Sequence, residues 1–276
     1  MNIPHRHRNI SVKRLLQDAW QFVRSQSFLS ERFGRPFRPS RDYVEIDITY
    51  RCNLKCINCN RSCAQAPSNI EMPVADMAAF LEQSIEHQIA WKRIRLLGGE
   101  PTLHSRFFDI IDLLIDYQRS CNPGVRLVLG SNYCGNQVHR VLAKLPEAIH
   151  VKSTLKSSRV NLFRPFNVAP VDKVAYRFAD YGCGCRIVED CGLGVTPSGY
   201  YMCAVAGGID RIFRYGLGRT SLPDQSDAML DQMRAFCGLC GHFGFQWPTR
   251  RARQSPTWRR AYQRLGGQET GPDPQG

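Results

Sequence analysis

The chain has 276 residues, of which 43% are hydrophobic, and a formal net charge of +13. This length suits one sizeable core, with room for a small appended domain. No apolar run approaches the roughly 18 residues of a membrane span, and the first residues lack the apolar stretch of a signal peptide. We therefore expect a cytoplasmic protein without a membrane span, whose 12 cysteines are metal ligands more than disulfides.

The positive charge is concentrated in two basic arms. Residues 1–41 hold nine Lys/Arg against two Asp/Glu, and residues 249–276 hold six against two, so the central residues 42–248 are close to neutral. Because solvated arms commonly have this composition, nucleic-acid binding is not favoured. The last arm, which lacks apolar residues from Gly266 on, is expected to be partly disordered.

The first arm contains one predicted helix. Its apolar residues recur at helical spacing: Leu15, Leu16, Ala19, Trp20 and Val23. A membrane-surface helix is one interpretation of this pattern next to basic residues. We favour a helix packed on the central sheet.

The central part begins with a strand and then alternates between helices and strands. In the first strand Val44, Ile46 and Ile48 alternate with polar residues, the pattern of a strand with two different faces. Further strands are predicted at 93–97, 125–129 and 149–154, and helices around 74–91, 105–119 and 136–145. This alternation predicts an α/β fold with a parallel sheet and right-handed crossovers.

Three cysteines follow the first strand directly, at Cys52, Cys56 and Cys59. They supply three thiolates where an iron–sulfur cube needs four, which leaves one iron open to a substrate or cosubstrate. This C-x3-C-x2-C loop resembles the cluster loop of the radical S-adenosylmethionine (SAM) superfamily. A zinc loop or a disulfide framework is the alternative, but neither predicts the preceding strand.

A second match to that superfamily follows the next strand, at Gly98, Gly99, Glu100 and Pro101. Two glycines at a strand end allow a ligand to approach the backbone closely. Glu100 adds a carboxylate suited to an ammonium group. The resemblance implies that this segment binds the methionyl amino group of SAM, and that the reducing electron breaks SAM into methionine and a 5′-deoxyadenosyl radical.

The resemblance also implies the fold and further SAM contacts. It implies a partial (β/α)6 barrel over residues 42–180, with the reactive site at the carboxyl ends of the strands. Ser131, Asn132 and Thr154 stand at two of these ends and are candidate SAM contacts, although ordinary strand-end capping explains them equally well. Lys156 stands where an acidic residue often contacts the ribose.

A second cysteine group lies in residues 181–248. Pro197-Ser198-Gly199 is a hairpin turn pattern, so Cys191 and Cys203 are expected to flank a β-hairpin. With Cys237 and Cys240 they make four thiolates, enough for a closed [4Fe–4S] cluster or a zinc site.

This layout resembles the twitch domain, the half-length form of the SPASM extension, which holds one auxiliary cluster. The chain length and the late C-x2-C are similar to those of aminocyclitol dehydrogenases in the same superfamily. Cys183 and Cys185 do not fit the simple pattern, and either is an alternative to Cys191 as the first ligand.

An auxiliary cluster suits a two-electron oxidation, so we expect a radical SAM oxidoreductase acting on a small polar substrate such as a sugar, aminocyclitol or nucleotide. A flavodoxin or ferredoxin is the expected electron donor. An anionic substrate would be favoured by a basic stretch, which contains Lys152, Lys156, Arg159, Arg164, Lys173 and Arg177. Candidates for proton transfer are Tyr200, Tyr201, Glu189 and Asp190.

Two other functions are compatible with the sequence. A radical SAM maturase that modifies a ribosomally made peptide is one, although residues 1–41 are too short for a peptide-recognition domain. A non-catalytic iron–sulfur electron carrier is the other, although such a protein needs no Gly98-Gly99-Glu100 segment.

Overall fold

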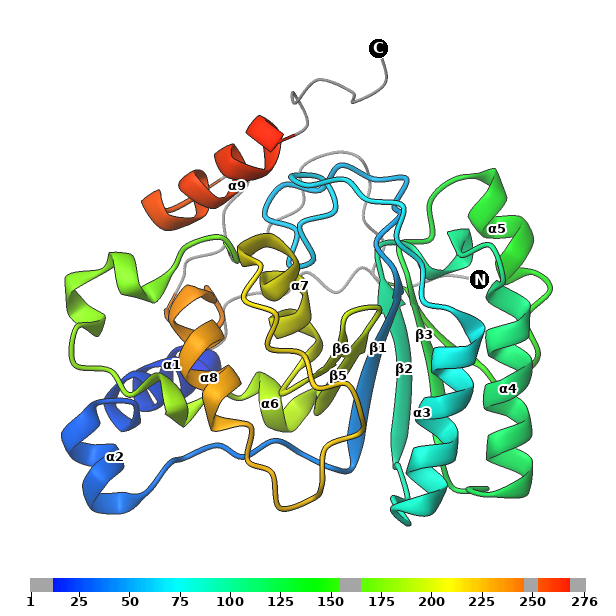
Figure 1. Ribbon diagram of the computed structural model, residues 1–276, viewed down its shortest axis with the longest axis horizontal. Helices are drawn as coiled ribbons and strands as arrows, with labels where there is room; N and C mark the ends of the chain where they lie inside the picture. The colour runs from blue at the N-terminus through cyan, green and yellow to red at the C-terminus, as the bar shows by residue number, and fades with distance from the viewer. Residues whose placement is uncertain (1–11, 154–164, 246–252, 269–276) are drawn as a thin grey trace.

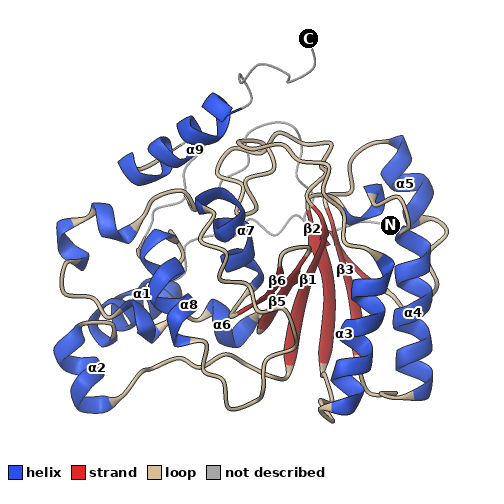
Figure 2. Cartoon of the chain, viewed as in Figure 1, coloured by secondary structure: helices blue, strands red, loops and turns tan. Residues whose placement is uncertain are grey.

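The computed structural model describes residues 12–153, 165–245 and 253–268 (Figure 1). A six-stranded sheet with the order β4-β3-β2-β1-β5-β6 forms its centre (Figure 2). The strands are β1 (Tyr43–Thr49), β2 (Arg93–Gly98), β3 (Arg126–Ser131), β4 (His150–Ser153), β5 (Leu193–Thr196) and β6 (Gly199–Tyr201). Neighbouring strands are parallel except β5 and β6, which form an antiparallel hairpin.

The first three strands are followed by helices that cover one face of the sheet. These are α3 (Val74–Glu86), α4 (Phe107–Ser120) and α5 (Asn136–Leu142). Val44, Ile46 and Ile48 of β1 are fully buried in the hydrophobic core that these helices share. Helix α3 ends before the predicted residue 91, because Gln88 has a left-handed φ of 54° that a helix interior does not accommodate.

The predicted α/β class, with an open sheet and a cysteine-rich hairpin and helix extension, is confirmed. The sheet is not built from six successive strand–helix units. The hairpin β5–β6 pairs with the free edge of β1, and β4 lies at the other edge. This pairing is close: a Cβ added at Gly192 would lie 1.9 Å from the Tyr43 carbonyl oxygen. The regions predicted as separate domains, 42–180 and 181–248, therefore share one sheet.

The remaining helices lie in the first arm, around the hairpin and in the last arm. They are α1 (Val12–Arg24), α2 (Ser27–Phe33), α6 (Ile187–Asp190), α7 (Ala204–Phe213), α8 (Leu230–Phe236) and α9 (Pro256–Gln268). Short 3-10 helices occur at Pro101–Leu103, Pro170–Asp172, Val174–Tyr176, Tyr181–Cys183 and Cys237–Leu239. Across the described ranges, no helix combines the length and apolar character needed to cross a bilayer.

Both basic arms differ from their predicted form. The first contains two helices, and α1 contacts the cysteine-rich part of the chain, where Gln21 Nε2 donates to the Phe243 carbonyl oxygen at 2.6 Å. The last arm contains α9, which is held because Trp258 is fully buried and its Nε1 donates to the Leu239 carbonyl oxygen at 2.7 Å. The predicted disorder beyond residue 268 lies outside the described residues.

Candidate functional site

The loop that carries Cys52, Cys56 and Cys59 starts at the carboxyl end of β1. None of the three thiols forms a disulfide, and all three are half-buried. Burial is the main cause that raises the pKa of Cys52, and the other two thiols add to it. In the part of the chain that the structure describes, no three His, Cys, Asp or Glu side chains are close enough to hold a single metal ion. The donor set of three thiols within eight residues is the one that suits a cluster with an open iron.

Asn132 connects this loop to the end of β3. Its Nδ2 donates to Asn53 Oδ1 at 2.7 Å and lies 4.0 Å from Cys52 Sγ. Its Oδ1 accepts from the Cys134 backbone N–H at 2.8 Å, while Asn53 Nδ2 donates to the Cys134 carbonyl oxygen at 2.7 Å. The side chain predicted to contact SAM therefore orients the cysteine loop.

Gly98 and Gly99 bring the end of β2 against the start of the same loop. The Gly99 N–H donates to the Thr49 carbonyl oxygen at 2.7 Å, and the Glu100 N–H donates to that of Arg51 at 2.8 Å. A Cβ at Gly98 would lie 2.1 Å from the Thr49 oxygen, and one at Gly99 would lie 2.2 Å from the Arg51 oxygen. Only glycine permits this approach, so the two sequence motifs are one structural unit.

We expect Gly99→Ala to move the cysteine loop, because the new methyl group would meet rigid backbone. The free energy of unfolding should fall by about 1–3 kcal/mol, and SAM affinity should fall with it. Chemical denaturation and equilibrium dialysis measure the two effects.

Gly130→Ala is the matched control, since its Cβ would meet only the end of the Leu97 side chain, at 2.5 Å. That flexible side chain can move. Equal losses of SAM affinity in the two variants would contradict the role assigned to Gly99.

Glu100 is fully buried, and its carboxylate is already hydrogen-bonded. Oε1 accepts from Thr102 Oγ1 at 2.8 Å and from Ser131 Oγ at 3.0 Å, and Oε2 accepts from the Asn132 N–H at 2.7 Å. These hydrogen bonds fix Glu100 against Ser131 and Asn132 at the strand ends. The contact of Glu100 with the ammonium group of SAM stays a prediction.

The other predicted contacts at strand ends are only partly described. Thr154 and Lys156 lie outside the described residues, as do Arg159 and Arg164. Lys152 is exposed on β4. Lys173 donates to the Phe245 carbonyl oxygen at 3.3 Å, and Arg177 lies over the Phe178 ring at 4.5 Å. The described members of the basic stretch therefore do not converge on one site.

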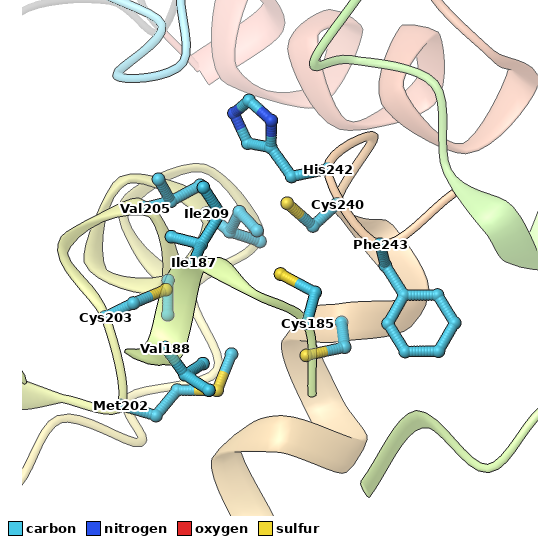
Figure 3. Close-up of a pocket in the computed structure, with 12 residues that line it drawn as sticks. Cys185, Ile187, Val188, Met202, Cys203, Val205, Ile209, Cys240, His242 and Phe243 are labelled. Carbon is cyan, nitrogen blue, oxygen red and sulfur yellow. The ribbon is translucent and has the colours of Figure 1, made fainter. Parts of the chain in front are cut away.

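Four cysteines of the second group line one small buried cavity (Figure 3). They are Cys185, Cys203, Cys237 and Cys240, with His242 and Phe243 on the same wall. Burial raises the pKa of Cys203 and of Cys240 to about 12, and neighbouring thiols add to the effect. Four thiols around one cavity are the donor set that a closed cluster needs, because each iron of the cube takes one thiolate.

Cys191 and Cys183, two candidates for the first ligand, are not among the residues that line this cavity. Cys191 lies beside Glu45 of β1, and burial, followed by that carboxylate, raises its pKa to about 12. Cys183 contacts the Arg24 carbonyl oxygen and Asp180 Oδ2, with Sγ at 3.9 and 3.7 Å. The geometry therefore favours Cys185, the alternative that the sequence left open.

Helix α7 connects the cavity to the cysteine loop. Cys203 is its N-cap, and five residues later a Cβ at Gly208 would lie 3.2 Å from the Asn60 carbonyl oxygen. Arg211 donates to the carbonyl oxygens of Arg61 and Ala66 at 2.8 and 2.9 Å. Since a helix rises 1.5 Å per residue, about 8 Å of helix separates Cys203 at the cavity from Gly208 at the cysteine loop.

A buried ion-pair cluster beneath the cysteine loop was not foreseen from the sequence. Arg61 Nε lies 3.0 Å from Asp47 Oδ2, and its Nη2 lies 3.5 Å from Glu45 Oε2. Arg95 Nη1 meets the other oxygen of Glu45 at 2.6 Å. Glu45 and Asp47 occupy the polar positions of an alternating strand, which the sequence alone cannot distinguish from a solvated face.

Helix α9 also contacts the loop. Tyr262 Oη lies 2.7 Å from Ser62 Oγ and accepts from Asn167 Nδ2 at 2.6 Å. The Arg253 N–H donates to Asn58 Oδ1 at 3.0 Å. The last arm, predicted as a solvated tail, therefore packs beside the loop that carries Cys52, Cys56 and Cys59.

The four candidates for proton transfer do not share one site. Tyr201 Oη donates to Asp210 Oδ2 at 2.9 Å in a buried pair, and Tyr200 packs toward Phe80 at 6.5 Å between ring centroids. Glu189 accepts from the Arg38 N–H at 3.4 Å, and Asp190 pairs with Arg186 at 3.1 Å. None of these contacts involves the cysteine loop.

The chain was compared with known proteins, and no family model matches it. It is 29% identical over 122 residues to a GTP 3′,8-cyclase of Aliarcobacter butzleri, covering 44% of this chain and 34% of that protein. It is 31% identical over 114 residues to one of Nautilia profundicola, covering 41% and 33%. The chain thus spans about a third of the length of these relatives.

Two solved structures show a weaker likeness. BtrN in complex with AdoMet and 2-DOIA has a TM-score of 0.42 and 15% identity, over 73% of this chain and 89% of that one. Streptococcus suis SuiB bound to S-adenosylmethionine has a TM-score of 0.30 and 24% identity, over 52% and 31%.

Proposed function

We propose that this chain is a radical SAM enzyme, which cleaves SAM reductively and removes hydrogen from a small polar substrate in a net two-electron oxidation. The observation that carries the proposal is the contact between the loop of Cys52, Cys56 and Cys59 and the Gly98-Gly99 segment, which backbone hydrogen bonds hold together.

The residues present fit the cofactors of that superfamily. Cys52, Cys56 and Cys59 would hold a [4Fe–4S] cluster, and the backbone at Gly98 and Gly99 would border SAM. When bound, these groups supply a 5′-deoxyadenosyl radical that takes a hydrogen atom from carbon. Glu100 and Asn132 orient the strand ends and the loop. Helix α7 and Tyr262 of α9 cover the loop and help to exclude water.

The second part of the proposal concerns the auxiliary site. Cys185, Cys203, Cys237 and Cys240 would hold a second [4Fe–4S] cluster, whose redox chemistry suits acceptance of one electron. Oxidation of a secondary alcohol would balance in this way: one hydrogen atom goes to the 5′-deoxyadenosyl radical, one proton goes to water, one electron goes to the auxiliary cluster, and a carbonyl group forms. Helix α7 supports the proposal, because it joins the auxiliary cavity directly to the cysteine loop.

For the substrate we propose a sugar, an aminocyclitol or a nucleotide-like molecule. The nucleotide-like alternative draws some support from the relatives named for GTP, which match this chain over about a third of their length.

The test is anaerobic SAM cleavage with dithionite, measured as 5′-deoxyadenosine. The wild type should form it, and the Cys52→Ala/Cys56→Ala/Cys59→Ala variant should not. A panel of sugars, aminocyclitols and nucleotides should then raise the yield and show carbonyl product for one class. Wild-type protein that carries its full iron load and forms no 5′-deoxyadenosine with any of these would contradict the proposal and favour the electron-carrier alternative.

A further inference from the structure

Helix α1 exposes most of its apolar stripe while two of its polar side chains are buried, although Phe22 packs inward against the Tyr176 ring and Trp20 lies edge-on to the Phe37 ring. Gln21 and Ser25 are 8% and 1% exposed, and both donate to backbone carbonyl oxygens. Leu16, Trp20 and Val23 are 66%, 51% and 50% exposed. Their spacing of four and three residues places them on one stripe of the helix. An amphipathic helix that only packs on its own protein would have the opposite orientation.

Helix α2 extends the apolar stripe. Phe28 and Phe33 are 67% and 64% exposed. Arg24 of α1 lies over the Phe33 ring at 5.5 Å and donates to the Gly34 carbonyl oxygen at 3.0 Å, which joins the two helices. We call the set Leu16, Trp20, Val23, Phe28 and Phe33 the α1–α2 apolar surface. Several exposed apolar side chains on two linked helices are typical of an interaction site.

The charge around this surface is positive. Residues 12–38 contain six Lys/Arg and two Asp/Glu, which gives a net charge of +4. Arg32 and Arg38 are exposed. A second copy of the chain would bring two surfaces of the same sign together, which is unfavourable. The positive charge therefore favours a negatively charged partner.

We propose that the α1–α2 apolar surface docks on an anionic lipid bilayer. A helix that lies flat with an apolar stripe, a tryptophan and flanking arginines has the features of an interfacial membrane helix, and anionic headgroups attract the arginines. Helices α1 and α2 lie at the lower left of the view, whereas the cysteine loop follows the carboxyl end of β1, at the top of the sheet (Figure 1). Docking through this surface leaves that end open to substrate.

Vesicle flotation of the full-length, reconstituted protein tests the proposal. The wild type should float with vesicles of phosphatidylcholine and phosphatidylglycerol, float less with phosphatidylcholine alone, and be released by salt. Leu16→Ser/Trp20→Ser should lower the partition coefficient at least about tenfold, since two exposed apolar side chains no longer enter the interface. Arg32→Gln/Arg38→Gln should lower it about tenfold on the anionic vesicles only.

Ile85→Ser on α3 is the matched control, because Ile85 is also 49% exposed on a helix but lies outside the surface. It should float like the wild type. The emission of Trp20, isolated as the difference from a Trp20→Phe variant, should shift to the blue on binding. Failure of the wild type to float, or equal flotation by Leu16→Ser/Trp20→Ser, would overturn the proposal. A dimer in ultracentrifugation that this double variant dissociates would also overturn it and assign the surface to a second copy.

Discussion

Cys185→Ala is expected to remove about four of about eight iron atoms from the reconstituted protein, whereas Cys191→Ala should leave all of them. Cys185 lines the cavity with three other thiols, and Cys191 lies beside Glu45. A cube that loses one of four thiolates is held much less firmly. Iron and sulfide analysis after anaerobic reconstitution, with electron paramagnetic resonance of the reduced protein, measures the outcome.

The cysteine-loop variant provides the complementary control. Cys52→Ala/Cys56→Ala/Cys59→Ala should retain about four iron atoms at the auxiliary site. If that protein binds no iron, or binds one zinc ion instead, the auxiliary cluster is absent and the oxidation loses its proposed electron acceptor. A loss of iron in Cys191→Ala but not in Cys185→Ala would reverse the assignment.

Breaking the buried pair of Asp47 and Arg61 should have the largest effect on stability. Removing one partner leaves a buried charge uncompensated, so Asp47→Leu or Arg61→Met should each lower the free energy of unfolding by about 3–5 kcal/mol. The side chains of Asp47 and Arg61 are 0% and 7% exposed. The double variant should cost less than either single change, since Glu45 then keeps Arg95 as its partner. Urea denaturation of the wild type, the two single variants and the double variant gives the four free energies of unfolding for a double-mutant cycle.

The pH dependence of the free energy of unfolding distinguishes the loss of the Asp47–Arg61 charge interaction from the loss of side-chain packing. Burial raises the pKa of Asp47, and the charge of Arg61 opposes that rise. In Arg61→Met the positive charge that lowers the pKa of Asp47 is lost, so the folded-state pKa of Asp47 should rise further above its unfolded value. The stability deficit should then shrink as the pH falls through this raised pKa, because Asp47 becomes neutral. A pH-independent deficit would indicate lost packing instead.

The exposed pair of Lys92 and Asp42 is the control for that experiment. Its nitrogen and oxygen lie 2.9 Å apart, but the two side chains are 66% and 48% exposed. Asp42→Ala should change stability only slightly, because water screens the charges. A loss as large as that in Asp47→Leu would show that burial is not the deciding factor.

Local sequence patterns predicted the strands, the cysteine loop and the Gly98-Gly99 strand end. Val44, Ile46 and Ile48 alternate strictly with polar residues, and all three lie in β1, where a strand was predicted. Cys52, Cys56 and Cys59 lie on one short loop, and Gly98-Gly99 ends one strand. Each of these features involves only a few neighbouring residues, and sequence spacing alone describes them.

Tertiary structure decided which distant groups meet. The sequence favoured Cys191 as the first auxiliary ligand, with Cys183 or Cys185 as alternatives. In the structure α6 lies between Cys185 and Cys191, and the pairing of β5 with β1 holds Cys191 beside Glu45. Leu16, Trp20 and Val23 fit either a packed or an exposed stripe, because periodicity identifies a face but not what it contacts. The sequence thus determined the local elements and the three-thiol loop. The auxiliary ligand set, the buried Asp47–Arg61 pair and the exposed surface of α1 depend on packing between segments far apart in the chain.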